Sequence, residues 1–273
     1  MAFEFLKYET ADGVARITLH RPDVYNALND GITYELQDAF KAVAKDEQVR
    51  VVVLTGEGKA FCSGQDLKET SPPALLRGGE GGSEAVRKRS FQESLHKRYN
   101  PIIRAMRNLP KPVIGRINGV AAGAGCSLAL ACDLLVASED ATLIEVFVNI
   151  GLVPDSGSSF FLPRLVGTAR AFELCSMGSR VKAKEALELG LVNRVVPPGQ
   201  LDAAVKEYTD YFAKAPTRAI GLIKKMLNKS ATATLEEMLE YEAYCQEIAG
   251  STLDYQEGVK AFLEKRKPVF LGK

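Results

Sequence analysis

The chain has almost no net charge of either sign. Its 273 residues include 35 basic and 34 acidic side chains, which leave a net charge of +1. No overall field therefore attracts nucleic acid or an anionic membrane surface, and neither is expected as a partner. An anionic ligand would have to be held by a local group of basic residues.

The sequence also lacks paired cysteines and long apolar runs. Its five cysteines are odd in number and show no C-x-x-C spacing, so neither a disulfide framework nor a thiolate metal site is indicated. No stretch of about 18 apolar residues is present, and Glu4, Lys7 and Glu9 interrupt the first segment, unlike a signal peptide. We therefore expect a cytoplasmic protein without a metal.

Hydrophobic patterning in the first third predicts strands around a helix. Residues 5–10 and 13–19 alternate as a β-hairpin would, and residues 33–44 carry an apolar stripe at helical spacing. Residues 50–56, RVVVLTG, contain a continuous apolar run, which is typical of a strand buried on both faces. This order of elements favours an α/β layered architecture.

The remainder of the chain is predicted to be helical at its end and irregular near residue 75. Residues 68–84 contain two prolines and four glycines, which predict a long mobile loop. Beyond Pro197 four amphipathic helices are expected, at residues 201–213, 217–228, 235–249 and 253–265. We therefore expect a core over residues 1–195 and a helical region over residues 196–273.

Two segments could present bare backbone N–H groups to an oxygen. A strand at residues 112–119 leads into a small-residue helix expected to begin near Ala121, and an uncovered helix start exposes unpaired N–H groups. Ser63-Gly64 follows the buried strand and predicts a sharp turn. Each has a plainer interpretation: tight helix-on-sheet packing for the first, and an ordinary Ser-Gly turn for the second.

Asp155, in the run IGLVPDSG, has two opposed interpretations. Its carboxylate could cap a short helix through the N–H of Gly157 or Ser158, which would lower its pKa. Alternatively, burial beside an apolar substrate would raise its pKa toward that of a useful base. The local sequence favours the cap, because caps are far commoner than catalytic acids.

Three segments in this order resemble the crotonase superfamily of acyl-CoA enzymes. They are FCSGQDL, NGVAAGAGCSLALACDL and IGLVPDSGSSFFLPRLVG, and the resemblance runs from residue 5 to residue 273. Within this superfamily the chain looks most similar to ring-1,2-epoxyphenylacetyl-CoA isomerases. The segments that carry this similarity include YNP at residues 99–101 and the C-terminal residues 254–273. The resemblance implies a right-handed spiral of ββα units, with C-terminal helices packing a homotrimer or a homohexamer made of two trimers.

The resemblance also implies roles for particular residues. The backbone N–H groups of Gln65 and Ala124 would form an oxyanion hole for a thioester oxygen, and Asp155 would be the base. The acyl pocket would include Tyr99, Ser127 and Phe147. CoA would lie against the segment made of Cys62, Ser63, Gly64, Gln65, Asp66 and Leu67. Its pantetheine would lie near residues 21–27 and its phosphates near basic residues such as Lys265, Arg266, Lys267 and Lys273.

Two departures from the hydratases of this superfamily favour an isomerase. Hydratases place glutamates where this chain has Ser127 and Phe147, so no acid pair is left to activate water. The implied reactions are conversion of the ring epoxide to an oxepin-CoA, a shift of 3-enoyl-CoA to 2-enoyl-CoA, or both. No cofactor is implied, because CoA carries the substrate. A hydratase-like enzyme of fatty-acid oxidation and a catalytically inactive acyl-CoA-binding subunit remain alternatives.

Overall fold

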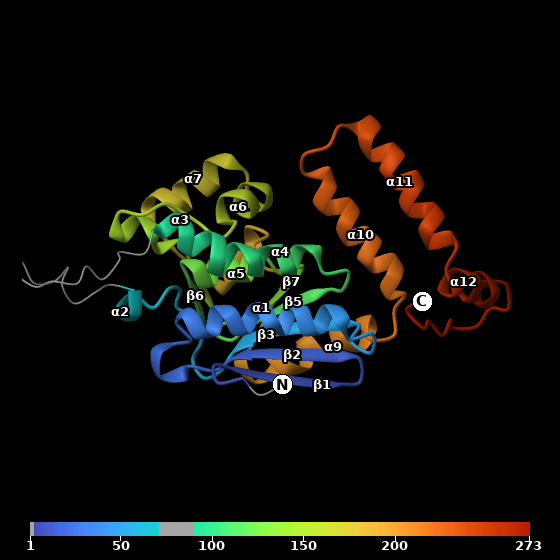
Figure 1. The fold of residues 1–273 in the computed structure, drawn as a ribbon, viewed down its shortest axis with the longest axis horizontal. Helices are drawn as coiled ribbons and strands as arrows, with labels where there is room; N and C mark the ends of the chain where they lie inside the picture. The colour runs from blue at the N-terminus through green and yellow to red at the C-terminus, as the bar shows by residue number, and fades with distance from the viewer. Residues whose placement is uncertain (1–2, 71–89) are drawn as a thin grey trace, which may run out of the picture.

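Two β-sheets form the centre of the molecule. The computed structural model describes residues 3–70 and 90–273. One sheet has the order β1 (Leu6–Ala11), β2 (Val14–Leu19), β3 (Val51–Gly56), β5 (Val113–Ile117), β7 (Leu134–Ser138) and β10 (Arg194–Val196) (Figure 1). The other has the order β4 (Ala60–Cys62), β6 (Val120–Ala122), β8 (Thr142–Ile144) and β9 (Arg180–Lys182).

From β3 to β8, successive strands alternate between the two sheets. β3, β5 and β7 pair in parallel in the larger sheet, and the strand that follows each of them, β4, β6 and β8 respectively, joins the smaller sheet. Each turn of the chain therefore adds one strand to both sheets, which is the predicted spiral. The predicted N-terminal hairpin is also confirmed, because β1 and β2 pair antiparallel.

The burial of strand β3 on both faces explains its largely apolar sequence, VVVLTG. All six of its residues are buried. Val52 and Leu54 belong to the main core, on the side of helix α1 (Asp30–Lys45), whereas Val51 and Val53 pack in a second cluster with residues of α9 (Leu201–Phe212). Helices thus cover both faces of the strand, as the continuous apolar run predicted.

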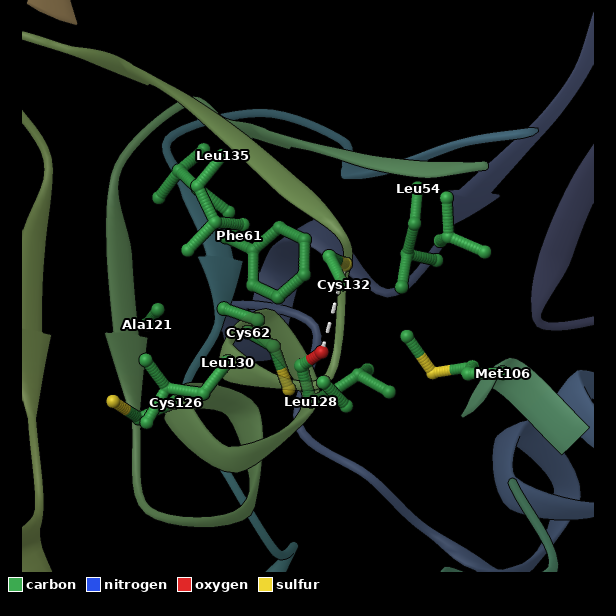
Figure 2. Close-up of a cluster of buried hydrophobic side chains, with 14 of the residues drawn as sticks. Leu54, Phe61, Cys62, Met106, Ala121, Cys126, Leu128, Leu130, Cys132 and Leu135 are labelled. Atoms are coloured by element: carbon green, nitrogen blue, oxygen red, sulfur yellow. Dashed lines mark hydrogen bonds between the residues drawn. The ribbon is translucent and has the colours of Figure 1, made fainter. Parts of the chain in front are cut away.

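The main core extends between the two sheets and the small-residue helix α5 (Ala124–Leu130). Phe61 of β4 lies among side chains of α5 and β7, including Leu128, Leu130 and Leu135 (Figure 2). All seven residues of α5 are buried. The helix is therefore enclosed by the fold and has no face of its own toward solvent.

The predicted start of this helix near Ala121 is wrong. Residues Val120–Ala122 form β6, and α5 begins at Ala124 after Gly123. The chain stays extended there because β6 pairs with β4 on one side and β8 on the other. Of the predicted loop at residues 68–84, residues 68–70 belong to the short helix α2 (Leu67–Thr70), and the rest lies outside the described residues.

The four predicted C-terminal helices are confirmed. They are α9, α10 (Thr217–Ser230), α11 (Leu235–Gly250) and α12 (Leu253–Leu263). α9 packs on the larger sheet, whereas α10 to α12 extend to one side of the body (Figure 1). The division at residue 195 stays a prediction. Within the described residues, no helix is long and apolar enough to cross a membrane.

Further helical segments connect the strands of the two sheets. They are α3 (Phe91–Ser94), a π-helical turn (Leu95–Tyr99), α4 (Asn100–Asn108), a 3-10 turn (Val146–Ile150), α6 (Ser158–Val166), α7 (Thr168–Met177) and α8 (Ala183–Glu188). α5 contacts α6, and α6 contacts α7, so the segment that carries Asp155 lies against the small-residue helix.

Candidate active site

Two backbone segments approach each other closely at the ends of β4 and β6. Gly64 has a φ of +96°, and a Cβ at this position would lie 2.8 Å from the carbonyl oxygen of Ala122 and 3.5 Å from the amide nitrogen of Ala124. A Cβ at Gly125 would lie 2.3 Å from the carbonyl oxygen of Cys62. Both positions therefore require glycine, because any larger residue would force the two segments apart.

This approach brings together two amide groups that have no other role. Among residues 3–70 and 90–273 neither Gln65 N–H nor Ala124 N–H has an acceptor, although their neighbours do. The N–H of Gly123 bonds to Ile144, and the N–H of Asp66 bonds to Leu28. The structure thus supplies two free donors where an oxyanion hole was expected, one from each predicted segment.

The expected CoA segment, Cys62 to Leu67, is held by the stretch at residues 21–28. Backbone hydrogen bonds run from Ser63 N–H to Tyr25 and from Leu28 N–H to Gly64. Arg21 forms an ion pair with the buried Asp66 at 2.9 Å and donates to the Ala27 carbonyl. The segment against which the resemblance places CoA and the stretch near which it places the pantetheine therefore lie side by side.

Asp155 does not cap a helix. Helix α6 begins at Ser158, its N-cap is Gly157, and no side chain bonds to the cap. The carboxylate instead accepts a hydrogen bond from the Ser156 hydroxyl at 2.8 Å. Burial raises the pKa of Asp155, and the Ser156 hydrogen bond partly opposes that rise. The capping interpretation is therefore wrong. The pKa of Asp155 is raised, as the alternative interpretation of this residue as a base requires.

The three expected acyl-pocket residues, Tyr99, Ser127 and Phe147, are all buried. Burial chiefly raises the pKa of Tyr99, the charge of Arg98 opposes the rise, and the charge of Asp155 adds to it. A Cβ at Gly123 would lie 3.9 Å from Cζ of Phe147, which places that ring beside the start of α5. The hydroxyl of Ser127 lies 3.0 Å from the carbonyl oxygen of Asp155.

One buried acid at the site was missed by the sequence reasoning. Glu145 is 4% exposed, and its Oε1 lies 2.8 Å from the hydroxyl of Ser158. Burial raises its pKa, the neighbouring Ser158 hydroxyl and Cys126 thiol oppose the rise, and the charge of Asp155 adds to it. The only available signal was an acid inside the apolar run TLIEVFV. In the described part of the chain, no cluster of three or more His, Cys, Asp or Glu could hold a metal ion.

Comparison with known proteins assigns the chain to an enzyme family. The family model described as enoyl-CoA hydratase/isomerase matches residues 9–273. The chain belongs to this family. It is an enzyme family, and both the fold and the acyl-CoA class of substrate agree with the resemblance stated from the sequence.

Curated relatives in this family carry both isomerase and hydratase names. The chain is 38% identical to "1,2-epoxyphenylacetyl-CoA isomerase" of Escherichia coli over 270 residues, 99% of each chain. It is also 38% identical to "Probable enoyl-CoA hydratase" of Rhodobacter capsulatus over the whole of both chains. A crystal structure of a putative enoyl-CoA hydratase from Streptomyces coelicolor matches with a TM-score of 0.89 and 34% identity, covering 100% of this chain and 96% of that one.

Replacing Ser156 by glycine should raise the pKa of Asp155 further. The change removes the hydroxyl that stabilises the ionised carboxylate, and glycine accepts the φ of +51° at this position. Carboxyl ¹³C NMR titration of wild type and Ser156→Gly measures the shift. An unchanged or lower pKa in the variant would mean that the hydroxyl does not stabilise the charged form.

Proposed function

We propose that this enzyme is an acyl-CoA isomerase that uses Asp155 as a single base. The observation that carries the proposal is a half-buried carboxyl of raised pKa, on a turn that is hydrogen-bonded to the helix at whose start the two free backbone donors meet. Ala124, one donor, begins the helix whose next turn contains Ser127, and the Ser127 hydroxyl contacts the Asp155 carbonyl. Base and donors therefore belong to one site.

In the proposed reaction the base moves one proton between two carbons of the acyl chain. The carboxylate of Asp155 takes a proton from the carbon next to the thioester carbonyl, and the electron pair passes to the carbonyl oxygen. The N–H groups of Gln65 and Ala124 donate to that oxyanion. Asp155 then returns the proton to another carbon as the electrons shift back, so a double bond has moved and no atom is gained or lost.

The pocket supports isomerisation over hydration. Ser127 and Phe147 occupy the positions where hydratases of this superfamily carry glutamates, and the Ser127 hydroxyl is engaged by Asp155 and Ser158. Among the described residues, no acid therefore stands at these two positions to activate water, and the buried Phe147 ring makes that wall apolar. The proposal requires no cofactor, because the thioester supplies the electron sink.

Two substrates fit the proposal. The relative named 1,2-epoxyphenylacetyl-CoA isomerase supports ring-1,2-epoxyphenylacetyl-CoA, with an oxepin-CoA as product and a role in phenylacetate catabolism. The same base can shift a 3-enoyl-CoA to a 2-enoyl-CoA. CoA would lie along Cys62 to Leu67 beside residues 21–28, and the basic C-terminus, including Lys265 and Lys273, would meet its phosphates. The free thiols of the described cysteines support a cytoplasmic location.

Replacing Asp155 by asparagine should lower isomerase kcat by about 10²- to 10⁴-fold, because the proton carrier is lost while the shape is kept. A spectroscopic panel of ring-epoxide, 3-enoyl and 2-enoyl thioesters, run on wild type and Asp155→Asn, measures this. Near-wild-type isomerisation by the variant would exclude the single-base mechanism. Water addition to 2-enoyl-CoA would favour a hydratase, and no turnover of any thioester would favour a binding subunit.

Replacing Gly64 by alanine should lower kcat by about 10²- to 10³-fold, which is the usual cost of losing one oxyanion donor. The new Cβ would press on the Ala122 carbonyl and displace the N–H of Gln65. Gly13→Ala is the matched control, because its φ is +80° but its Cβ would meet nothing closer than 3.5 Å. Equal losses of kcat in the two variants would show that backbone strain alone is responsible.

We also propose that the C-terminal helices join three copies of the chain, with two such trimers in a hexamer. Large apolar side chains are exposed along them, including Leu235, Leu239, Tyr244, Leu253, Phe262 and Leu263. Phe262 is 82% exposed, and exposed apolar surface of this extent marks an interaction face.

Light scattering should therefore give three or six times the chain mass of 29.7 kDa. Phe262→Asp should dissociate the assembly, because a charge cannot be buried there without a partner. Tyr211→Asp, at an exposed aromatic on α9, serves as the control. A wild-type protein that is monomeric at all concentrations would exclude the trimer.

A further inference from the structure

A chain of polar groups connects the buried Glu145 to the segment of the base. Oε1 of Glu145 lies 2.8 Å from the hydroxyl oxygen of Ser158, which lies 2.8 Å from that of Ser127. The Ser127 hydroxyl lies 3.0 Å from the carbonyl oxygen of Asp155, and its longer contact, 3.3 Å to the carbonyl oxygen of Gly123, draws on the same hydrogen. The four groups come from the end of β8, from α6, from α5 and from the turn before α6, and three hydrogen-bond distances join them.

Three hydrogen bonds require three hydrogens, and the two hydroxyls supply only two. The Asp155 carbonyl can only accept, so at that end the hydrogen must come from Ser127. Ser127 then accepts from Ser158, and Ser158 has no hydrogen left for Glu145. The third hydrogen can come only from Glu145 itself, in its protonated form.

An ionised Glu145 leaves one of the three distances without a hydrogen. Its carboxylate would draw the Ser158 hydrogen, and Ser158 would draw that of Ser127. The oxygens of Ser127 and Asp155 would then face each other at 3.0 Å with no hydrogen between them. Two buried acceptors in such contact repel, so the Asp155 turn would lose one of the bonds that fix it.

We infer that Glu145 is a positioning residue: a neutral carboxylic acid whose proton completes this chain and holds the Asp155 turn in place. The inference rests on the proposed role of Asp155 as the base. Glu145 does not touch the substrate in this assignment, because Ser158 and Ser127 stand between it and the turn.

The surroundings of Glu145 favour the neutral form. Its Oε2 is buried and has no hydrogen-bond partner among the described residues, which is far costlier for a charged oxygen than for a neutral one. Apolar side chains line the small cavity beside it, namely Leu130, Leu143, Leu162, Leu174 and Leu191. The titratable groups that interact with it are Cys126 of α5, Cys175 of α7 and Asp155, and each is negative when ionised.

Infrared spectroscopy tests the protonation state directly. Wild type at neutral pH should show the carbonyl stretch of a protonated carboxylic acid, which Glu145→Gln removes and Asp155→Asn retains. Absence of the band from wild type, or its persistence in Glu145→Gln, would overturn the inference. The infrared band does not depend on turnover, so it reports the protonation state of Glu145 even if the proposed isomerase activity is not found.

The pH profile of kcat/KM tests the positioning role. In wild type kcat/KM should fall at alkaline pH with the same midpoint at which the infrared band disappears. Glu145→Gln should keep kcat within about threefold, because its amide still donates to Ser158, and should lack that alkaline fall. An unchanged alkaline fall in Glu145→Gln would show that Glu145 does not act through the chain.

Ser127→Ala provides the second variant, because it removes the bond to the Asp155 carbonyl without changing a titratable group. Its kcat should fall by about tenfold or less, the value of one hydrogen bond, with KM nearly unchanged and no alkaline fall. A Ser127→Ala enzyme with wild-type kcat, or with the wild-type alkaline fall, would contradict the proposed chain.

Discussion

The close approach of the backbone at Cys62–Gln65 to that at Ala122–Gly125 is the constraint on which the site depends. It follows from the parallel pairing of β4 with β6 in the smaller sheet, and it is possible only because Gly64 and Gly125 carry no side chain. At this approach the N–H groups of Gln65 and Ala124 have no acceptor within the described part of the chain. The large buried core around α5 and Phe61 holds the two segments at this separation.

The proposed site concentrates little charge, and in the proposed mechanism this is what separates it from a two-acid hydratase. Asp155 has a raised pKa because it is partly buried, and no cation among the groups that shift it favours its ionised form. The second acid nearby, Glu145, lies behind two serine hydroxyls. One carboxylate opposite neutral backbone donors is suited to proton transfer within a substrate, where the same group must both take and return the proton.

The sequence predicted most of the fold, because its patterns are local. The all-buried β3, the N-terminal hairpin and the four C-terminal helices each carry a periodicity that their own packing explains. The start of α5 was placed at Ala121, because pairing of β6 with β4 and β8 depends on residues distant in the chain. Local reasoning also favoured a cap at Asp155, but the carboxylate bonds to Ser156 instead. Glu145 gave no clear signal, since its partner Ser158 lies 13 residues away.

The alternation of strands between the two sheets has a consequence for how the chemistry is distributed. Gln65 follows β4, Ala124 follows β6 and Asp155 comes in the segment after β8, so each successive turn of the spiral contributes one element at the same end of the smaller sheet. In the proposed site, the first two turns contribute main-chain groups that every amino acid possesses, and only the third contributes a side chain. A repeated scaffold of this kind separates the part that holds the oxygen from the part that selects the reaction. The identity of the reaction can then change by substitution in one turn while the other two remain as they are.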